Sequence, residues 1–201
     1  MTALLVTGAW VVVGLALLLS GIAPYERNTW WMEVAPVLLV VPVLWCSRKY
    51  FPLTPLLMGL IALHALVLIV GGAYTYARVP FGFWMQDVLH LSRNPYDKIG
   101  HFMQGFVPAL AAREVLIRHR WLVRSGVAGV LALCVAMTVS ALYELVEWWA
   151  ALALGQVAGD FLGAQGDVWD TQSDMFFALI GASVAMVFLG RLQDEQIRRI
   201  Q

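Results

Sequence analysis

Apolar runs of about twenty residues recur along the whole chain, and they constrain its fold more than any other feature. Hydrophobic residues make up 61% of the sequence and charged residues 13%, about half the charged fraction of a soluble domain. A helix of such a length spans the hydrocarbon core of a bilayer, which is about 30 Å thick. The composition therefore predicts an all-α, polytopic integral membrane protein.

The apolar runs predict a bundle of six transmembrane helices in a single domain that covers residues 1–201. The predicted spans are 3–22, 30–46, 54–76, 96–115, 125–152 and 170–190. No soluble domain fits between them. The first run lacks the basic segment that opens a signal peptide, so we interpret it as a retained transmembrane helix.

The distribution of Lys and Arg predicts the orientation of the bundle. If the N-terminus is cytoplasmic, nine of these residues lie in cytoplasmic loops and the tail, against four on the opposite side. Cytoplasmic loops are enriched in Lys and Arg, so both termini are expected to be cytoplasmic. The net charge of zero gives no indication of a nucleic-acid partner, and the lipid bilayer is the expected one.

Three pairs of ionisable residues occur at helical spacing, one pair in each of three spans. They are Asp97 and His101, Glu144 and Glu147, and Asp170 and Asp174, with Asp167 three residues before the last pair. The spans that begin at 96 and 170 start on the outer side, and Glu144 lies about 28 Å along its helix from Ser125. All three pairs should therefore lie near the periplasmic face. Because ionisable groups in a membrane are costly, they predict a functional site there.

Carboxylates and a histidine in one place are typical ligands of a divalent metal. The candidate metal ligands are His101, Glu144, Asp167, Asp170 and Asp174, and the candidate catalytic residues are Asp97 and Glu147. Oxygen-rich sets suit Mg²⁺, Mn²⁺ or Ca²⁺, and a histidine also admits Zn²⁺ or Fe²⁺. Neighbouring acids repel each other unless a proton or a cation lies between them, which favours a divalent metal as cofactor.

Each pair also has a purely structural explanation. Asp97 would lie in the first turn of a helix that begins with Asn94-Pro95, where the helix dipole favours an acid. The two glutamates would lie in water at an interfacial helix end. The pattern Thr171-x-x-Asp174 is similar to a capping box at the start of the last span.

Two further polar residues lie in predicted spans. His64 is near the middle of the span 54–76, where we expect a hydrogen-bonded buried histidine. Glu33 begins the span 30–46 on the outer side, so it either joins the polar cluster or serves as a first-turn acid.

Three strings resemble the YjdF-like family of bacterial inner-membrane proteins. They are DKIGH at 97–101, YELVEWW at 143–149 and GDVWDTQSDM at 166–175. The resemblance covers nearly the whole chain. It implies a location in the bacterial inner (plasma) membrane and assigns no reaction. Asp97-Lys98-x-x-His101, with the later Asp170 and Asp174, is also similar to VanZ-like proteins, which are associated with glycopeptide-antibiotic tolerance. The asparagine expected shortly after the last acid is absent. This second likeness favours a cell-envelope or lipid-linked role.

The sequence is compatible with three functions. The first is a metal-dependent enzyme that acts at the outer leaflet on a lipid or lipid-linked head group. The second is a proton- or cation-coupled transporter, which six short spans would form as a homo-oligomer; the inverted repeat common in carriers is absent from this sequence. The third is a non-catalytic membrane protein whose polar cluster fixes the packing of its helices.

Overall fold

The computed structural model describes residues 3–119, 125–154 and 165–200, and these residues form helices and no strands. The helices are α1 (Ala3–Ser20), α2 (Arg27–Ser47), α3 (Pro55–Tyr74), α4 (Pro80–Leu89), α5 (Tyr96–Arg118), α6 (Ser125–Leu154), α7 (Asp170–Val184) and α8 (Gly190–Ile200). A π-helical turn, η2 (Ala185–Leu189), joins α7 to α8. The prediction of an all-helical chain is confirmed for the described residues.

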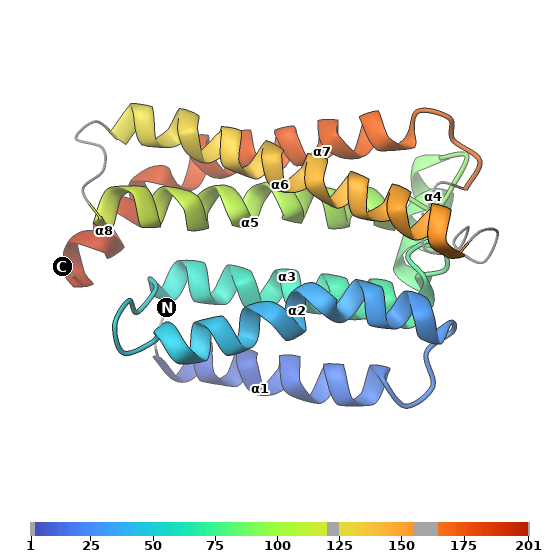
Figure 1. Ribbon diagram of the computed structural model, residues 1–201, viewed down its shortest axis with the longest axis horizontal. Helices are drawn as coiled ribbons and strands as arrows, with labels where there is room; N and C mark the ends of the chain where they lie inside the picture. The colour runs from blue at the N-terminus through green and yellow to red at the C-terminus, as the bar shows by residue number, and fades with distance from the viewer. Residues whose placement is uncertain (1–2, 120–124, 155–164, 201) are drawn as a thin grey trace.

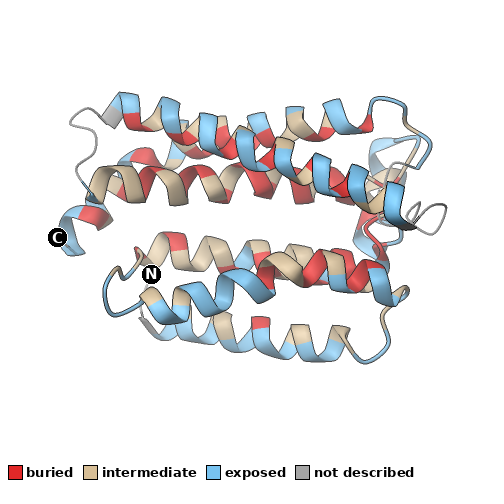
Figure 2. Cartoon of the chain, in the orientation of Figure 1, coloured by how far each residue is buried: buried red, intermediate tan, exposed pale blue. Residues whose placement is uncertain are grey.

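The long helices lie in two layers with their axes nearly parallel (Figure 1). One layer holds α1, α2 and α3, and the other holds α5, α6 and α7. The layers pack on each other mainly through α3 against α5, and α8 also reaches α3. Figure 2 shows that exposed residues cover the outer faces of both layers. Many of these are large and apolar, as lipid-facing surfaces require.

Four helical segments are long and apolar enough to cross a membrane: Arg27–Ser47, Pro55–Tyr74, Gly126–Ala153 and Asp170–Ile200. A shorter apolar helix covers Leu4–Ser20. Length and composition therefore support several crossings and do not by themselves confirm the predicted six. The long helix α5 is not among these apolar segments, since it carries Asp97 and Lys98 in its first turn and Arg113, Glu114 and Arg118 near its end.

Most helix boundaries lie within a few residues of the predicted spans, and three differences have a clear cause or are larger. α2 begins at Arg27, because the Glu26 side chain caps it by accepting from the backbone N–H groups of Asn28 and Thr29. Slight burial raises the pKa of Glu26, but these two hydrogen bonds outweigh it and the pKa lies below its ordinary value. The last span continues through η2 to Ile200 instead of ending near 190. The short helix α4 was not predicted, since ten residues give too weak a periodic pattern.

α5 and α7 approach each other closely because small residues line their contact. A Cβ atom at Gly105 would overlap the backbone carbonyl of Ala178, and one at Gly181 would overlap the carbonyl of Phe102. Backbones that meet in this way are typical of helix pairs in membranes. Both helices begin at the same end of the bundle (Figure 1), so the contact fixes the register of a parallel pair.

The opposite end of the bundle holds a second buried polar group. Glu114 of α5 accepts hydrogen bonds from the backbone N–H and the hydroxyl of Thr54, at 2.9 and 2.7 Å. Gln193 of α8 donates to the carbonyl of Leu110 at 2.8 Å, and Arg118 of α5 donates to Glu114 at 3.1 Å. These contacts tie α5 to α8 and to the start of α3, and each carboxylate oxygen of Glu114 has a partner.

We expect Gly105→Val to destabilise the protein by about 3 kcal/mol or more, because the added side chain must push α7 away from α5. Gly14→Val is the matched control, since nothing lies within 4 Å of a Cβ at Gly14. Thermal unfolding in detergent, followed by intrinsic fluorescence, measures the difference. Equal melting temperatures for the two variants would contradict the close packing of α5 and α7.

Candidate functional site

Six of the seven predicted site residues meet at one end of the second layer. They are Asp97 and His101 from α5, Glu144 and Glu147 from α6, and Asp170 and Asp174 from α7, and each is less than a tenth exposed. The expectation that the three pairs lie at the same depth therefore agrees with the structure. Their assignment as metal ligands and catalytic groups stays a prediction.

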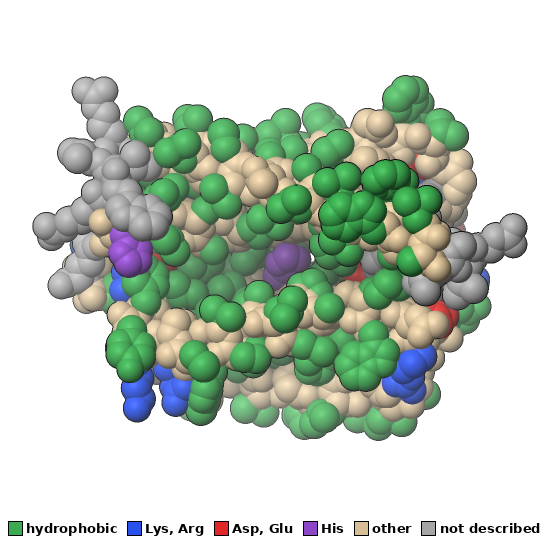
Figure 3. Space-filling model, in the orientation of Figure 1, with side chains coloured by type: hydrophobic (Ala, Val, Ile, Leu, Met, Phe, Trp, Pro, Cys, Tyr) green, Lys and Arg blue, Asp and Glu red, His purple; other side chains and the backbone are tan. Residues whose placement is uncertain are grey.

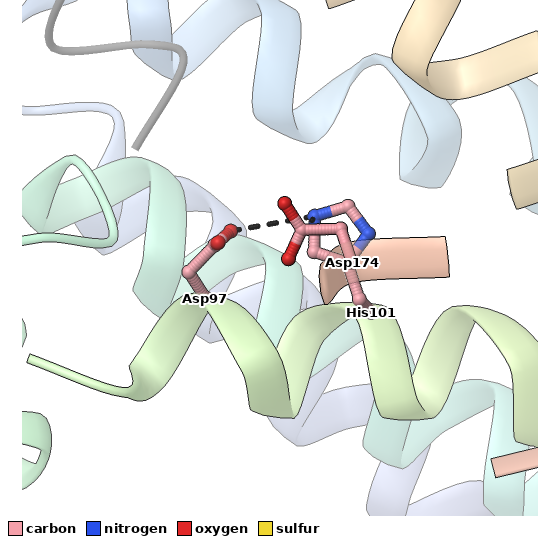
Figure 4. Close-up of side chains that lie close together, drawn as sticks. All are labelled: Asp97, His101 and Asp174. Carbon is pink, nitrogen blue, oxygen red and sulfur yellow. Dashed lines mark ion pairs between the residues drawn. The ribbon is translucent and has the colours of Figure 1, made fainter. Parts of the chain in front are cut away.

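The register of α5 and α7 explains why His101 meets Asp174. Gly105 faces Ala178, and one helical turn back from each lies His101 and Asp174. His101 Nε2 lies 3.7 Å from Asp174 Oδ1 and 3.4 Å from Asp97 Oδ1. Figure 4 shows Asp97 and His101 rising from the same face of α5, with the carboxylate of Asp174 beside the imidazole.

Two of the structural explanations fail here. Glu144 and Glu147 are 7% and 9% exposed, so they do not lie in water at a helix end. Asp174 does not cap α7, because the helix begins at Asp170 and its N-cap, Trp169, makes no side-chain cap hydrogen bond. The predicted helix start at Asn94-Pro95 is one residue early, since α5 begins at Tyr96; Asn94 Oδ1 still accepts from the Tyr96 N–H at 3.0 Å.

Lys98 also belongs to the cluster, although it was not among the predicted site residues. Its Nζ lies 2.8 Å from Asp170 Oδ1, 2.5 Å from Asp174 Oδ1 and 3.3 Å from Asp97 Oδ2. One ammonium group thus joins three acids from two helices. The sequence placed Lys98 next to Asp97 but did not indicate this contact, because adjacent residues of a helix normally point in different directions.

Arg93 is the second cation that the sequence analysis missed. It donates to Asp167 Oδ2 at 2.7 Å and to Asp170 Oδ1 at 2.8 Å. The side chain of Asp167 is about one-third exposed, at 32%, and lies with Arg93 instead of with His101. Asp167 and Asp170 therefore belong to an ion-pair network at the start of α7. Neither is in the two groups of residues whose geometry suits a metal ion.

His101 has two chemically different sides. On the Nε2 side, Asp97 and Asp174 are already paired with Lys98. On the other side, Nδ1 lies 3.0 Å from Gln104 Oε1 and 3.6 Å from Glu144 Oε1. Carboxylate oxygens thus lie near both ring nitrogens, and each nitrogen there would hold either a proton or a metal ion.

On the Nδ1 side of His101, the part of the chain that the structure describes places no Lys or Arg to balance the acids. Among the described residues, the ion pairs of Glu144 and Glu147 include none with a Lys or Arg, and Glu144 Oε1 is buried without a hydrogen-bond partner. The Ser140 hydroxyl, one turn before Glu144, is also buried and unpartnered. Two buried acids in one place strongly favour a bound cation or proton.

Two groups of three side chains have ligand atoms within 4.8 Å of one another: Asp97, His101 and Asp174, and His101, Glu144 and Glu147. The ammonium of Lys98 occupies the first group and would repel a metal ion. The second group contains no such cation from the described residues. The geometry therefore favours His101, Glu144 and Glu147 as the place for a positive charge.

A cavity of about 610 Å³ lies between the two layers and reaches this polar cluster. Its polar end is lined by Glu33, Tyr76, Asp97, His101, Tyr143 and Glu147. Glu33 belongs to α2 in the other layer, is 4% exposed, and accepts a hydrogen bond from the Tyr143 hydroxyl at 3.4 Å. Glu33 therefore joins the cluster, one of the two alternatives that the sequence left open.

His64 does not have the hydrogen bond that was expected at its Nε2. That atom is buried without a partner, and the residue lines the cavity. The expectation of a hydrogen-bonded histidine is therefore wrong at Nε2. Figure 3 shows the surface hollowed between the layers, with a histidine visible inside the hollow and hydrophobic side chains around it.

We expect Lys98→Met to lower the free energy of unfolding by about 3–5 kcal/mol, because it leaves three buried acids without their shared cation. The double variant Lys98→Met/Asp174→Asn should recover part of this loss, since one of the three charges is removed. Chemical unfolding in detergent micelles measures both. A single variant as stable as the wild type would contradict the role given to Lys98.

The chain resembles known proteins over almost its whole length. A family model described as predicted membrane protein (DUF2238) matches residues 5–195. Inner membrane protein YjdF of Escherichia coli (strain K12) is 57% identical over 185 residues, which cover 92% of this chain and 88% of the relative. No solved structure matches the chain significantly. These matches confirm the family resemblance found in the sequence. The chain therefore belongs to the DUF2238 family of membrane proteins and is a multi-pass protein of the bacterial inner membrane.

Proposed function

We propose that the chain crosses the membrane six times, with both termini in the cytoplasm and the polar cluster on the periplasmic side. α1 and α5 would complete the count, since both lie parallel to the four more clearly apolar segments (Figure 1). The charges of α5 do not exclude it, because they are buried against neighbouring helices and paired. Arg48, Lys49 and the basic residues of α8 lie at the end opposite the cluster, in keeping with the positive-inside rule.

We propose further that the protein is a metal-dependent enzyme that acts on the head group of a lipid or lipid-linked substrate. The observation that carries this proposal is the Nδ1 side of His101. There two buried glutamates lack a Lys or Arg partner among the described residues, and the group opens into a cavity between helices. A mainly apolar cavity between membrane helices suits a lipid, which can reach it from the surrounding bilayer, better than a water-soluble substrate.

The residues of this side divide into distinct roles. His101 and Glu144 would hold a divalent ion, which could polarise a phosphoryl or carbonyl oxygen or activate water. Glu147 lines the cavity, so it can reach a substrate and serve as general base. Asp97 contacts His101 Nε2 and would orient the imidazole, as carboxylates do behind metal-bound histidines.

We expect the purified wild-type protein to contain a divalent metal at about one equivalent and Glu144→Ala to contain none, because Glu144 supplies a buried carboxylate that has no Lys or Arg partner among the described residues. Asp87→Asn, an exposed acid of α4, is the control and should keep the metal. Elemental analysis of protein purified in detergent without chelator measures this. Wild-type protein without metal would overturn the proposal.

A structural role is the second candidate, and the Lys98 network favours it. Lys98 and Arg93 already pair four aspartates from α5, α7 and the segment before α7. If the cluster served packing alone, the glutamates of α6 would be protonated and would bind no metal. The two functions therefore differ in how stability responds to a metal ion.

We expect Mn²⁺ or Zn²⁺ at a hundred times its dissociation constant to stabilise the wild type by about 2.7 kcal/mol, because the ion binds the folded state only. Glu147→Gln should respond less, and Glu144→Gln should not respond. Thermal unfolding with and without each ion measures the shift. If the wild type and both variants melt at temperatures independent of metal, the packing role is the better explanation.

A further inference from the structure

The cavity beside the polar cluster continues far along the bundle. Its wall on α5 runs from Asp97 to Leu116, about 28 Å at the rise of a helix, which is close to the full thickness of the hydrocarbon core. Beyond Gln104 the described wall consists of Val, Ala, Pro, Leu and Ile side chains, together with His64 and Trp10. The cavity is therefore polar at one end and apolar along the rest of its length.

The cavity opens sideways, towards the acyl chains of the bilayer. The layers meet along α3 and α5, and the gap between α2 and α6 remains open on the face seen in Figure 3. Val40 and Val41 of α2 and Val135 and Val139 of α6 line the cavity and are also 37–43% exposed, so they form the two edges of the opening. At the polar end the hydrogen bond from Tyr143 to Glu33 joins these helices.

The shape of the cavity selects one kind of occupant. A transmembrane helix is about 10 Å wide with its side chains, and a helix that spanned the full length of the groove would have to break the hydrogen bond that joins Tyr143 of α6 to Glu33 of α2. A helix of a second copy therefore does not fit. A small polar solute does not suit the apolar part of the cavity either, because few polar atoms line it. Two of these atoms are Trp10 Nε1 and His64 Nε2, which have no hydrogen-bond partner among the described residues. A single hydrocarbon chain matches both the length and the lining of the cavity.

We propose that this groove binds one hydrocarbon chain of a membrane lipid, which enters sideways between α2 and α6. The lipid head lies at Glu33, His101 and Glu147, and the chain extends towards the cytoplasmic side along α5. This inference rests on the proposed function and deepens it, since it gives the substrate class as a lipid whose chain is held apart from the bilayer. Each buried CH₂ exchanges lipid for protein contacts, so close fit to the wall and not water exclusion sets the affinity.

The test uses full-length protein in nanodiscs of phosphatidylcholine that contain a small fraction of phosphatidylcholine with a photoreactive diazirine in one acyl chain. After illumination, mass spectrometry of peptides maps the labelled residues. We expect labelling of inward-facing residues such as Val107 on α5. Ala112→Phe fills the inner half of the groove and should reduce the labelling of Val107 by about tenfold, a loss of about 1.4 kcal/mol. Ala153→Phe, on an exposed part of α6, is the matched control.

Val139→Trp is a second variant, at a half-exposed edge of the opening, and it should also reduce labelling of Val107. Labelling confined to outward-facing residues such as Leu131, the same in all variants, would overturn the inference, as would cross-links between two copies through this groove. Metal content is measured on the same preparations. Labelling of the groove without bound metal would overturn the enzyme proposal and support the chain-binding groove. Bound metal without labelling of the groove would support the enzyme proposal and overturn the chain-binding groove.

Discussion

The close contact between α5 and α7 is the constraint on which the rest of the site depends. Gly105 and Gly181 let the two backbones touch, and because both helices run in the same direction the contact sets a single register. One turn back from it, the acids at the start of α7 reach His101 and Lys98 of α5. Without this register the buried charges would face apolar side chains, which costs several kcal/mol for each unpaired group.

The imidazole of His101 divides the buried charges into a neutralised part and an unbalanced part. On the Nε2 side, Lys98 and Arg93 compensate the aspartates, so this side is an ion-pair network. On the Nδ1 side, Glu144 and Glu147 of α6 have no Lys or Arg partner in the described chain, and Glu147 lines the cavity. If these glutamates served packing alone, apolar side chains in their place would make the folded protein more stable, because burying an uncompensated acid costs free energy. This arrangement is expected where a ligand supplies the missing positive charge.

The two layers are joined unevenly, and this creates the cavity. α3 and α5 pack along the middle, Glu114 and Gln193 form hydrogen bonds at the end of the bundle near α8, and Glu33 with Tyr143 joins the layers at the other end. Between α2 and α6 the layers stay apart, so lipid-facing valines also line the interior. In a soluble protein such an opening would fill with water, but here the surrounding solvent is hydrocarbon.

The sequence alone determined the membrane class, the approximate helix limits and the shared depth of the three polar pairs. These follow from composition and from distances along single helices, which are local properties. Only the tertiary structure decided which acids pair with cations, that Asp167 lies with Arg93 and apart from His101, and that Glu33 crosses from the other layer. It also decided where the cavity lies. The physical reason is that pairing and cavities depend on the register and separation of helices distant in sequence, and these are set by contacts such as Gly105 with Ala178.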